Sequence, residues 1–314
     1  SNSKFNSLEK KIDRNTDDGG NLDINESIVS LYLLNVNSKE SIDFPKGSYL
    51  ICDVRILIGD DSQQRKYIKD IKEARIEAFF SSIRPSFCIN ETMLENGQYK
   101  FSFIKGRGRL FSDNREITKN LGIYTSLYSN EFNEGGLWYA SLDAIWELIS
   151  YGRKRLVIRG KWPYLPIIQI WEIKPSHNGF IWKIDMEVYV STHIKRYQAN
   201  LMLSDHYKNW SVSGRQSNSF PEEFALLRWD SLYRGKATDR LCISVKDNRT
   251  INILPSLNFS CFRKASNFEA RIENSNATFN SRILGFDRIV NKDRGLLEPG
   301  VYEYFYGEIN FNGK

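Results

Sequence analysis

The second half of the chain consists of one strand-like segment after another, and this feature constrains the fold more than any other. Between residues 180 and 190 the side chains alternate, with apolar and aromatic residues on one face and Lys183, Asp185, Glu187 and Tyr189 on the other. Such a two-residue period is typical of an antiparallel strand that packs one face on a core. Further strands are predicted at residues 155–160, 167–174, 193–203, 241–245, 258–262, 268–273, 281–287 and 301–311.

The first half adds strands and little helix. Strands are predicted at residues 28–36, 48–59, 99–104, 109–111 and 123–128, with a hairpin turn at 105–108. Residues 141–149 predict a helix with Ser141 as its N-cap and Asp143 in its first turn, whereas residues 63–80 fit either a helix or a strand. Many strands without a βαβ order predict an all-β fold with one or two short helices, as a large antiparallel β-sandwich or supersandwich.

Composition separates a polar start from a long globular part. Residues 1–26 are polar and predict a flexible N-terminal segment. Residues 27–314 are expected to form a single large β-sandwich domain, and a sub-boundary, if there is one, is expected near residues 152–165. The sequence leaves open whether the chain is a whole protein or a module with neighbouring domains.

The charge balance is mild, since 44 basic residues face 38 acidic ones and the formal net charge is +6. The two signs are interspersed, which does not favour nucleic acid as a partner. No apolar run reaches the roughly 18 residues of a membrane-spanning helix, and no signal peptide is visible. We therefore expect a soluble protein that does not contact a membrane, with the cytoplasm favoured as its compartment.

Metal and cofactor signatures are missing from the sequence. The four cysteines form no CxxC pair, and the histidines form no HxH or HxxxH pair. No GxSxG or GxGxxG motif occurs, and the glycines at 106 and 108 lack the spacing of a phosphate-binding loop. We expect neither a metal ion nor a cofactor.

One window of the sequence concentrates the residues that most often form ligand sites. All seven tryptophans lie between Trp138 and Trp229, and the three histidines, His177, His193 and His206, lie in the same window. Indole rings stack on ligands, and histidine titrates near neutral pH. A site in this protein is therefore expected here.

Two sets of residues in the window are candidates for a site. Asp185 and Glu187 share one strand face about 7 Å apart, and with His193 they are candidate acid–base or sugar-binding groups. The alternative is that they form the solvent face of an amphipathic strand.

The second set is the loop residues Asp205, His206, Tyr207 and Trp210, whose types line carbohydrate sites. Its alternative is a structural loop whose rings cover a sheet edge. We expect these four residues to bind the ligand, and His206, His193, Asp185 and Glu187 to be the candidates for any catalytic role.

Residues 155–311 carry long segments of the type IIQIWEIK, GFIWKIDMEVYV and HIKRYQANLMLSDHYKNW, followed by NFSCF, FEARIENS and SRILGF. In strand rhythm they resemble galactose-mutarotase-like supersandwich domains, which occur in aldose epimerases and in other carbohydrate-active proteins. The resemblance implies a carbohydrate-binding architecture. The NxHxYF-type motif of aldose epimerases is missing, and the pair His206 and Tyr207 is only a faint partial match to it.

The preferred interpretation is a β-sandwich that binds an oligo- or polysaccharide, as a protein or as an accessory domain of a carbohydrate-active one. The first alternative is a sugar-acting enzyme, a mutarotase-like isomerase or a polysaccharide lyase, that uses His206 with a carboxylate. The second is a structural or scaffold β-protein whose tryptophans are all buried and line no cleft.

Overall fold

A computed structural model describes residues 10–12, 29–31, 61–81, 91–131, 135–163, 165–213, 215–236, 242–247, 254–262, 268–290 and 295–312. The chain divides into two compact units, Ser1–Ile58 and Gly59–Lys314. Of the first unit only β1 (Lys10–Ile12) and β2 (Val29–Leu31) are described, and they pair antiparallel. The predicted strand at 48–59 and nearly all of the polar segment 1–26 lie outside the described residues.

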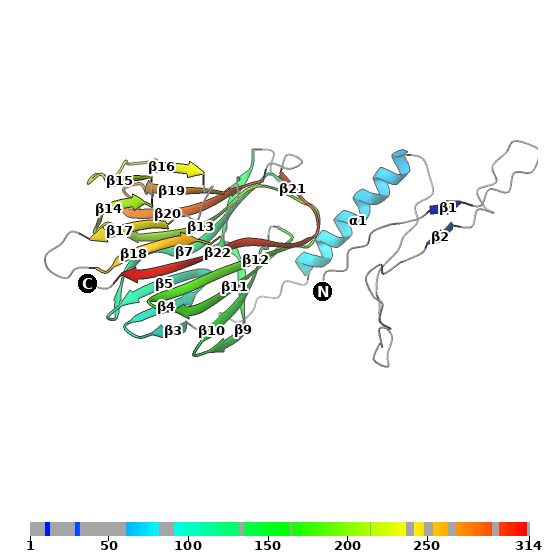
Figure 1. The fold of residues 1–314 in the computed structure, drawn as a ribbon. Helices are drawn as coiled ribbons and strands as arrows, with labels where there is room; N and C mark the ends of the chain where they lie inside the picture. The colour runs from blue at the N-terminus through cyan, green and yellow to red at the C-terminus, as the bar shows by residue number, and fades with distance from the viewer. Residues whose placement is uncertain are drawn as a thin grey trace, which may run out of the picture. The chain divides into compact units, whose positions relative to one another are not determined.

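The described elements of the second unit are one α-helix, one 3₁₀ turn and twenty strands (Figure 1). Their bounds are α1 Asp61–Ser81, β3 Thr92–Asn96, β4 Tyr99–Ile104, β5 Arg107–Ser112, β6 Arg115–Glu116, β7 Thr118–Ser129, β8 Leu137–Ala140, η2 Ser141–Asp143, β9 Ile145–Gly152, β10 Arg155–Lys161, β11 Ile167–Ser176, β12 Gly179–Val188, β13 Thr192–Ser204, β14 Tyr207–Val212, β15 Gln216–Ser219, β16 Asp230–Lys236, β17 Cys242–Asp247, β18 Ser256–Cys261, β19 Phe268–Asn274, β20 Ser281–Ile289, β21 Leu296–Leu297 and β22 Gly300–Asn312.

These strands form two large antiparallel sheets. The nine-stranded sheet has the order β15-β14-β17-β18-β22-β12-β11-β10-β9. The eleven-stranded sheet has the order β16-β19-β20-β13-β7-β5-β4-β3, with β21, β6 and β8 paired at its side. One hydrophobic cluster contains residues of both sheets, so the predicted all-β sandwich is confirmed. β10, which lies within the segment predicted as a sub-boundary, pairs with both β9 and β11 inside the nine-stranded sheet.

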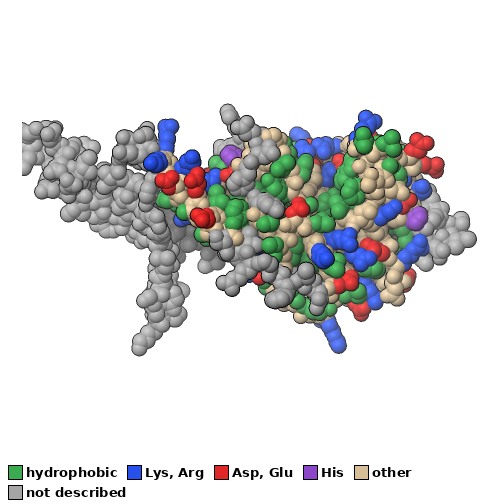
Figure 2. Space-filling model, turned by 180° about the vertical axis from the view of Figure 1, so that it is seen from behind, with side chains coloured by type: hydrophobic (Ala, Val, Ile, Leu, Met, Phe, Trp, Pro, Cys, Tyr) green, Lys and Arg blue, Asp and Glu red, His purple; other side chains and the backbone are tan. Residues whose placement is uncertain are grey.

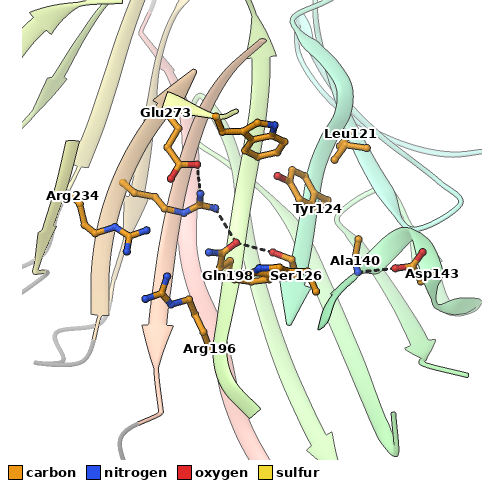
Figure 3. Close-up of a pocket in the computed structure, with 12 residues that line it drawn as sticks. Leu121, Tyr124, Ser126, Ala140, Asp143, Arg196, Gln198, Arg234 and Glu273 are labelled. Carbon is orange, nitrogen blue, oxygen red and sulfur yellow. Dashed lines mark hydrogen bonds and ion pairs between the residues drawn. The ribbon is translucent and has the colours of Figure 1, made fainter. Parts of the chain in front are cut away.

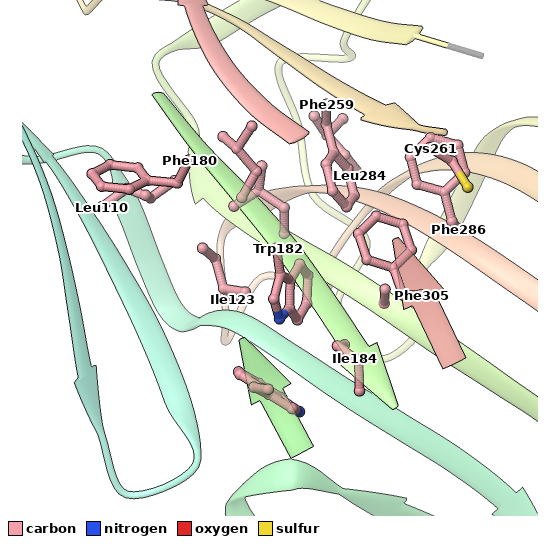
Figure 4. Packing of buried hydrophobic residues seen from close by; sticks show 14 of the residues in the cluster. Leu110, Ile123, Phe180, Trp182, Ile184, Phe259, Cys261, Leu284, Phe286 and Phe305 are labelled. Atoms are coloured by element: carbon pink, nitrogen blue, oxygen red, sulfur yellow. The ribbon is translucent and has the colours of Figure 1, made fainter. Parts of the chain in front are cut away.

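Aromatic side chains fill the space between the sheets (Figure 4). The ring of Trp171 lies 4.9 Å from that of Trp146 and 5.1 Å from that of Trp182, centroid to centroid. Trp182 in turn lies 5.2 Å from Phe305 of β22. The two tryptophan pairs meet edge to face, an arrangement that stabilises aromatic pairs beyond the burial of their area. The alternation predicted for residues 180–190 is confirmed in β12, where Trp182 and every second residue after it are buried.

The ambiguous segment 63–80 is helical, within α1. Phe79 near the end of the helix is buried, and its ring lies 5.3 Å from that of Tyr189. The Nζ atom of Lys72 donates to a carboxylate oxygen of Glu131 at 2.6 Å. These two contacts join the helix to the sandwich. Within the described parts of the chain, no helix combines the length and apolar character that crossing a membrane requires.

The hairpin predicted at residues 105–108 is confirmed between β4 and β5. Lys105 and Gly106 form its turn, and both have positive φ, 46° and 78°. Two-residue hairpin loops of this kind require φ > 0 at both positions. A Cβ atom on Gly106 would lie 2.1 Å from the backbone oxygen of Ser141, so glycine is needed for its small size as well.

The helix predicted at residues 141–149 is wrong. Ser141–Asp143 form a single 3₁₀ turn, and Ile145–Gly152 form the edge strand β9. The Ser141 hydroxyl donates to the Gly106 backbone oxygen at 2.6 Å instead of capping a helix, and the indole of Trp146 donates to the Ser141 oxygen at 2.7 Å. These contacts and the pairing of β9 with β10 favour the extended chain over its local helical preference.

Charged side chains of both signs are interspersed on the face seen in Figure 2, as the sequence predicts. No group of three His, Cys, Asp or Glu side chains that could hold a metal ion occurs among the described residues.

The close contact at Gly106 gives a stability prediction. Gly106→Ala is expected to lower the free energy of unfolding by about 1–3 kcal/mol more than Gly97→Ala, measured by urea denaturation. Both glycines have positive φ, but a Cβ on Gly97 would meet nothing within 4 Å. The difference between the two variants therefore isolates the collision with Ser141. Equal losses in both variants would contradict this account of the turn.

Candidate functional site

A pocket of about 410 Å³ opens on the face of the eleven-stranded sheet that points away from the core (Figure 3). Its lining comes mainly from β7, β13, β16 and β19, with β8, η2 and the residue before β16 at its rim. The lining residues are Leu121, Tyr124, Ser126, Trp138, Ala140, Asp143, Arg196, Gln198, Trp229, Arg234, Arg271 and Glu273.

Strand alternation accounts for the position of these residues. In β19, Ala270 and Ile272 belong to the hydrophobic core, so Arg271 and Glu273 point to the opposite face. In β13, Tyr197, Ala199 and Leu201 belong to the same core, so the alternate residues of that strand face the pocket. Neighbouring strands thus contribute polar side chains to one shared surface, which we call the floor of the pocket.

Arg271 lies at the centre of this floor. Its Nε atom donates to Asp287 Oδ1 at 2.7 Å, and its Nη1 atom donates to Glu273 Oε2 at 2.5 Å. Its Nη2 atom donates to Gln198 Oε1 at 3.0 Å and to Asn200 Oδ1. Burial alone lowers the pKa of Arg271, but the carboxylates of Asp287 and Glu273 outweigh it and the pKa is raised. The guanidinium is therefore a permanent cation held in place on several sides.

The backbone of β20 leaves room for this group. A Cβ on Gly285 would lie 2.9 Å from Arg271 Nε and 3.0 Å from Asn200 Oδ1. Glycine at this position allows the guanidinium to lie against the strand. Ser126 completes the floor, because its hydroxyl donates to Gln198 Oε1 at 2.8 Å and accepts from Asn200 Nδ2 at 3.2 Å.

Two indole rings frame the pocket. Trp138 of β8 is 49% exposed, and its ring lies 5.2 Å from that of its cross-strand neighbour Tyr128. Trp229 is half-buried and meets Phe279 edge to face at 6.0 Å. Tyr124 lies on the floor, and burial raises its pKa, so its hydroxyl stays protonated at neutral pH. The pocket thus combines aromatic faces with hydrogen-bonding groups.

The residues predicted to bind a ligand lie elsewhere. Tyr207 is fully buried and donates to the Pro255 oxygen at 3.0 Å, while Trp210 is 3% exposed and packs on Tyr233. Asp205 is paired with Lys119 at 3.0 Å, and His206 Nδ1 lies 2.8 Å from the Ser204 hydroxyl. None of the predicted residues lines the pocket. Their role in ligand binding stays a prediction, and the two buried rings offer no free face.

The predicted catalytic candidates lie on or next to strands of both sheets. Asp185 and Glu187 lie on β12 in the nine-stranded sheet, where Asp185 accepts from Lys183 Nζ at 2.7 Å. His193 lies near the start of β13 in the eleven-stranded sheet, and His206 lies just after its end. An extended strand of this length spans roughly 40 Å, so the two histidines are far apart. None of these four residues lines the pocket described above, and their catalytic role stays a prediction.

A signal for the pocket exists in the sequence but is weak. In FEARIEN the charged residues Glu269, Arg271 and Glu273 share one strand face, and in β13 Gln198 and Asn200 interrupt an apolar run. Each pattern alone is that of an ordinary solvent face. Only the pairing order β19-β20-β13-β7 shows that these polar faces adjoin.

No protein family and no curated protein matches the sequence. Among solved structures the chain is similar to a galactose mutarotase related enzyme from Lactobacillus acidophilus, at 9% identity and a TM-score of 0.45, over 71% of this chain and 98% of that one. It is similar to a galactose mutarotase-like protein from Lactobacillus casei at 9% identity and a TM-score of 0.42, over 71% of this chain and 100% of that one.

A third similar structure is a GH36 alpha-galactosidase from Geobacillus stearothermophilus, at 11% identity and a TM-score of 0.43, over 71% of this chain and 40% of that one. What the chain binds has to follow from its own residues.

The buried ion pairs of the floor give a second prediction. Arg271→Met would leave Asp287 and Glu273 without their main cation, and we expect the free energy of unfolding to fall by about 3–5 kcal/mol. The matched control is Arg228→Met, which removes an 83% exposed arginine paired with Asp230 and should cost less than about 1 kcal/mol. Chemical denaturation measures both, and similar small losses would show that Arg271 does not hold the floor together.

Proposed function

We propose that this β-sandwich binds carbohydrate in the pocket of the eleven-stranded sheet. The observation that carries the proposal is the combination of two partly exposed indoles, Trp138 and Trp229, with a floor of amide, hydroxyl and guanidinium groups. Sugars present apolar C–H faces and many hydroxyls, so they fit sites that pair aromatic rings with fixed polar groups.

The volume of the pocket and the fixed positions of its floor residues support this proposal. A volume of about 410 Å³ falls within the range of small-ligand sites, about 300–1,000 Å³. The polar floor is fixed before a ligand arrives, because Arg271, Gln198 and Ser126 are joined by hydrogen bonds. A fixed floor lowers the entropy cost of binding.

The scaffold alternative fits less well. It requires that all tryptophans are buried and that they line no cleft. Trp162, Trp171 and Trp182 are indeed buried in the core, but Trp138 is half exposed at the mouth of a pocket. A large indole kept at a pocket mouth is more typical of a binding site than of a scaffold surface.

The enzyme alternative that relies on His206 is also less favoured. No histidine is among the described residues that line the pocket. Of its carboxylates, Glu273 accepts from Arg271 and Asp143 Oδ2 accepts from the Ala140 backbone nitrogen at 2.8 Å. Both are engaged within the protein, so a binding role is better supported than acid–base catalysis.

The test is the affinity of tryptophan variants for glycans. After a glycan array has identified a ligand, Trp138→Ala and Trp229→Ala are each expected to weaken binding by about 1–3 kcal/mol in calorimetric titrations. Tyr151→Ala, which removes a 54% exposed ring on the edge strand β9, should leave the affinity unchanged. Full affinity in both tryptophan variants would place the glycan site elsewhere on the molecule.

A further inference from the structure

Two arginines at one flank of the pocket have hydrogen-bonding capacity that the described part of the chain does not use. Arg196 of β13 and Arg234 of β16 both extend toward the pocket (Figure 3). Each lies near the same oxygen, Asp287 Oδ2, at 3.6 Å and 3.7 Å, and Arg234 lies 3.9 Å from Glu269. These separations are ion-pair distances, longer than hydrogen bonds. Neither guanidinium donates a hydrogen bond to another described residue.

The pairing of β16 with β19 places Arg234 directly opposite Arg271. Like charges on directly opposed residues destabilise a sheet. Asp287 accepts its hydrogen bond from Arg271, through Oδ1, so Arg196 and Arg234 have only ion-pair contacts with its other oxygen, and Arg234 has one more with Glu269. A third cation added at a cost to the fold is typical of a functional position.

The acidic side chains around the pocket are more deeply buried than Arg196 and Arg234. The side chains of Asp287 and Glu273 are 0% and 10% exposed, whereas those of Arg196 and Arg234 are 28% and 40% exposed. A ligand entering from solvent therefore meets the cations first, with the carboxylates behind them. The planar guanidinium donates in a fork that matches the oxygens of an anionic group.

From this arrangement we infer that the pocket takes an acidic sugar, whose carboxylate or sulfate is held by Arg196 and Arg234 while its ring lies against the indoles. This inference rests on the proposed function and names the class of ligand. Arg271 is a positioning residue in it, because its own donors are engaged by the floor. Asp143, on the opposite flank of the pocket in Figure 3, disfavours an anion there and so orients the ligand.

The experiment uses the whole chain on a glycan array that carries carboxylate-bearing, sulfated and neutral glycans. The strongest carboxylate-bearing ligand is then titrated beside its uncharged methyl ester, which has the same rings and lacks only the charge. We expect the acid to bind at least tenfold more tightly than the ester, with an affinity that falls as salt concentration rises. If the sulfated set binds best instead, the anionic group is a sulfate and the inference stands.

Arginine variants connect the preference to these two residues. Arg196→Gln and Arg234→Gln should each weaken binding of the acid tenfold or more and leave binding of the ester unchanged. Arg234→Lys keeps the positive charge but lacks the paired N–H donors of the guanidinium, so it should weaken binding of the acid to an intermediate extent. Arg228→Gln removes a neighbouring arginine that does not line the pocket and should have no effect. Melting temperatures of all variants verify that they are folded.

The outcomes separate the two proposals. Equal binding of acid and ester, lost in Trp138→Ala and kept in the arginine variants, would overturn the acidic-sugar inference and leave the carbohydrate site standing. Binding of the acid that neither arginine variant weakens would also overturn it. Binding of no glycan in any of the three classes would overturn the proposed function, and the inference with it.

Discussion

The central strands of the eleven-stranded sheet have two unlike faces, and both the core and the pocket depend on that difference. One face of β13 and β19 carries alternate apolar residues into the aromatic core between the sheets. The other face carries amides and Arg271, which hydrogen-bond with side chains of the neighbouring strands, so that the network spans the four strands β7, β13, β20 and β19. A shift of one residue in the register of either strand would exchange the two faces and lose both.

Arg271 connects stability with function in this arrangement. A buried guanidinium is costly unless carboxylates and further acceptors surround it, and Asp287, Glu273, Gln198 and Asn200 provide them. The resulting network fixes the floor of the pocket, and Gly285 gives it room. The less buried Arg196 and Arg234 then remain available at the surface. We regard the deep network as the support and the outer pair as the contact with the ligand.

The sequence predicts most of the sandwich, because alternation is a local property that each strand displays by itself. It fails at residues 141–149, where helical composition is outweighed by contacts of Ser141 and Trp146 with the distant Gly106 turn. The sequence also does not predict the pocket of the eleven-stranded sheet. The tryptophans of the predicted window are divided between the core and the pocket, and no local pattern distinguishes Trp138 from Trp171. The floor residues come from strands separated by more than a hundred residues, and their proximity follows only from strand order.

The central claim is that a glycan is held against Trp138 and Trp229, and indole nitrogen–proton spectra test it most directly. Each of the seven tryptophans gives one indole signal, which the single-site variants assign. On titration with an acidic glycan we predict shifts in the signals of Trp138 and Trp229 and no shift in those of the buried Trp162, Trp171 and Trp182. Shifts centred on Trp210, with the signals of Trp138 and Trp229 unchanged, would contradict the account and move the site to the turn between β13 and β14.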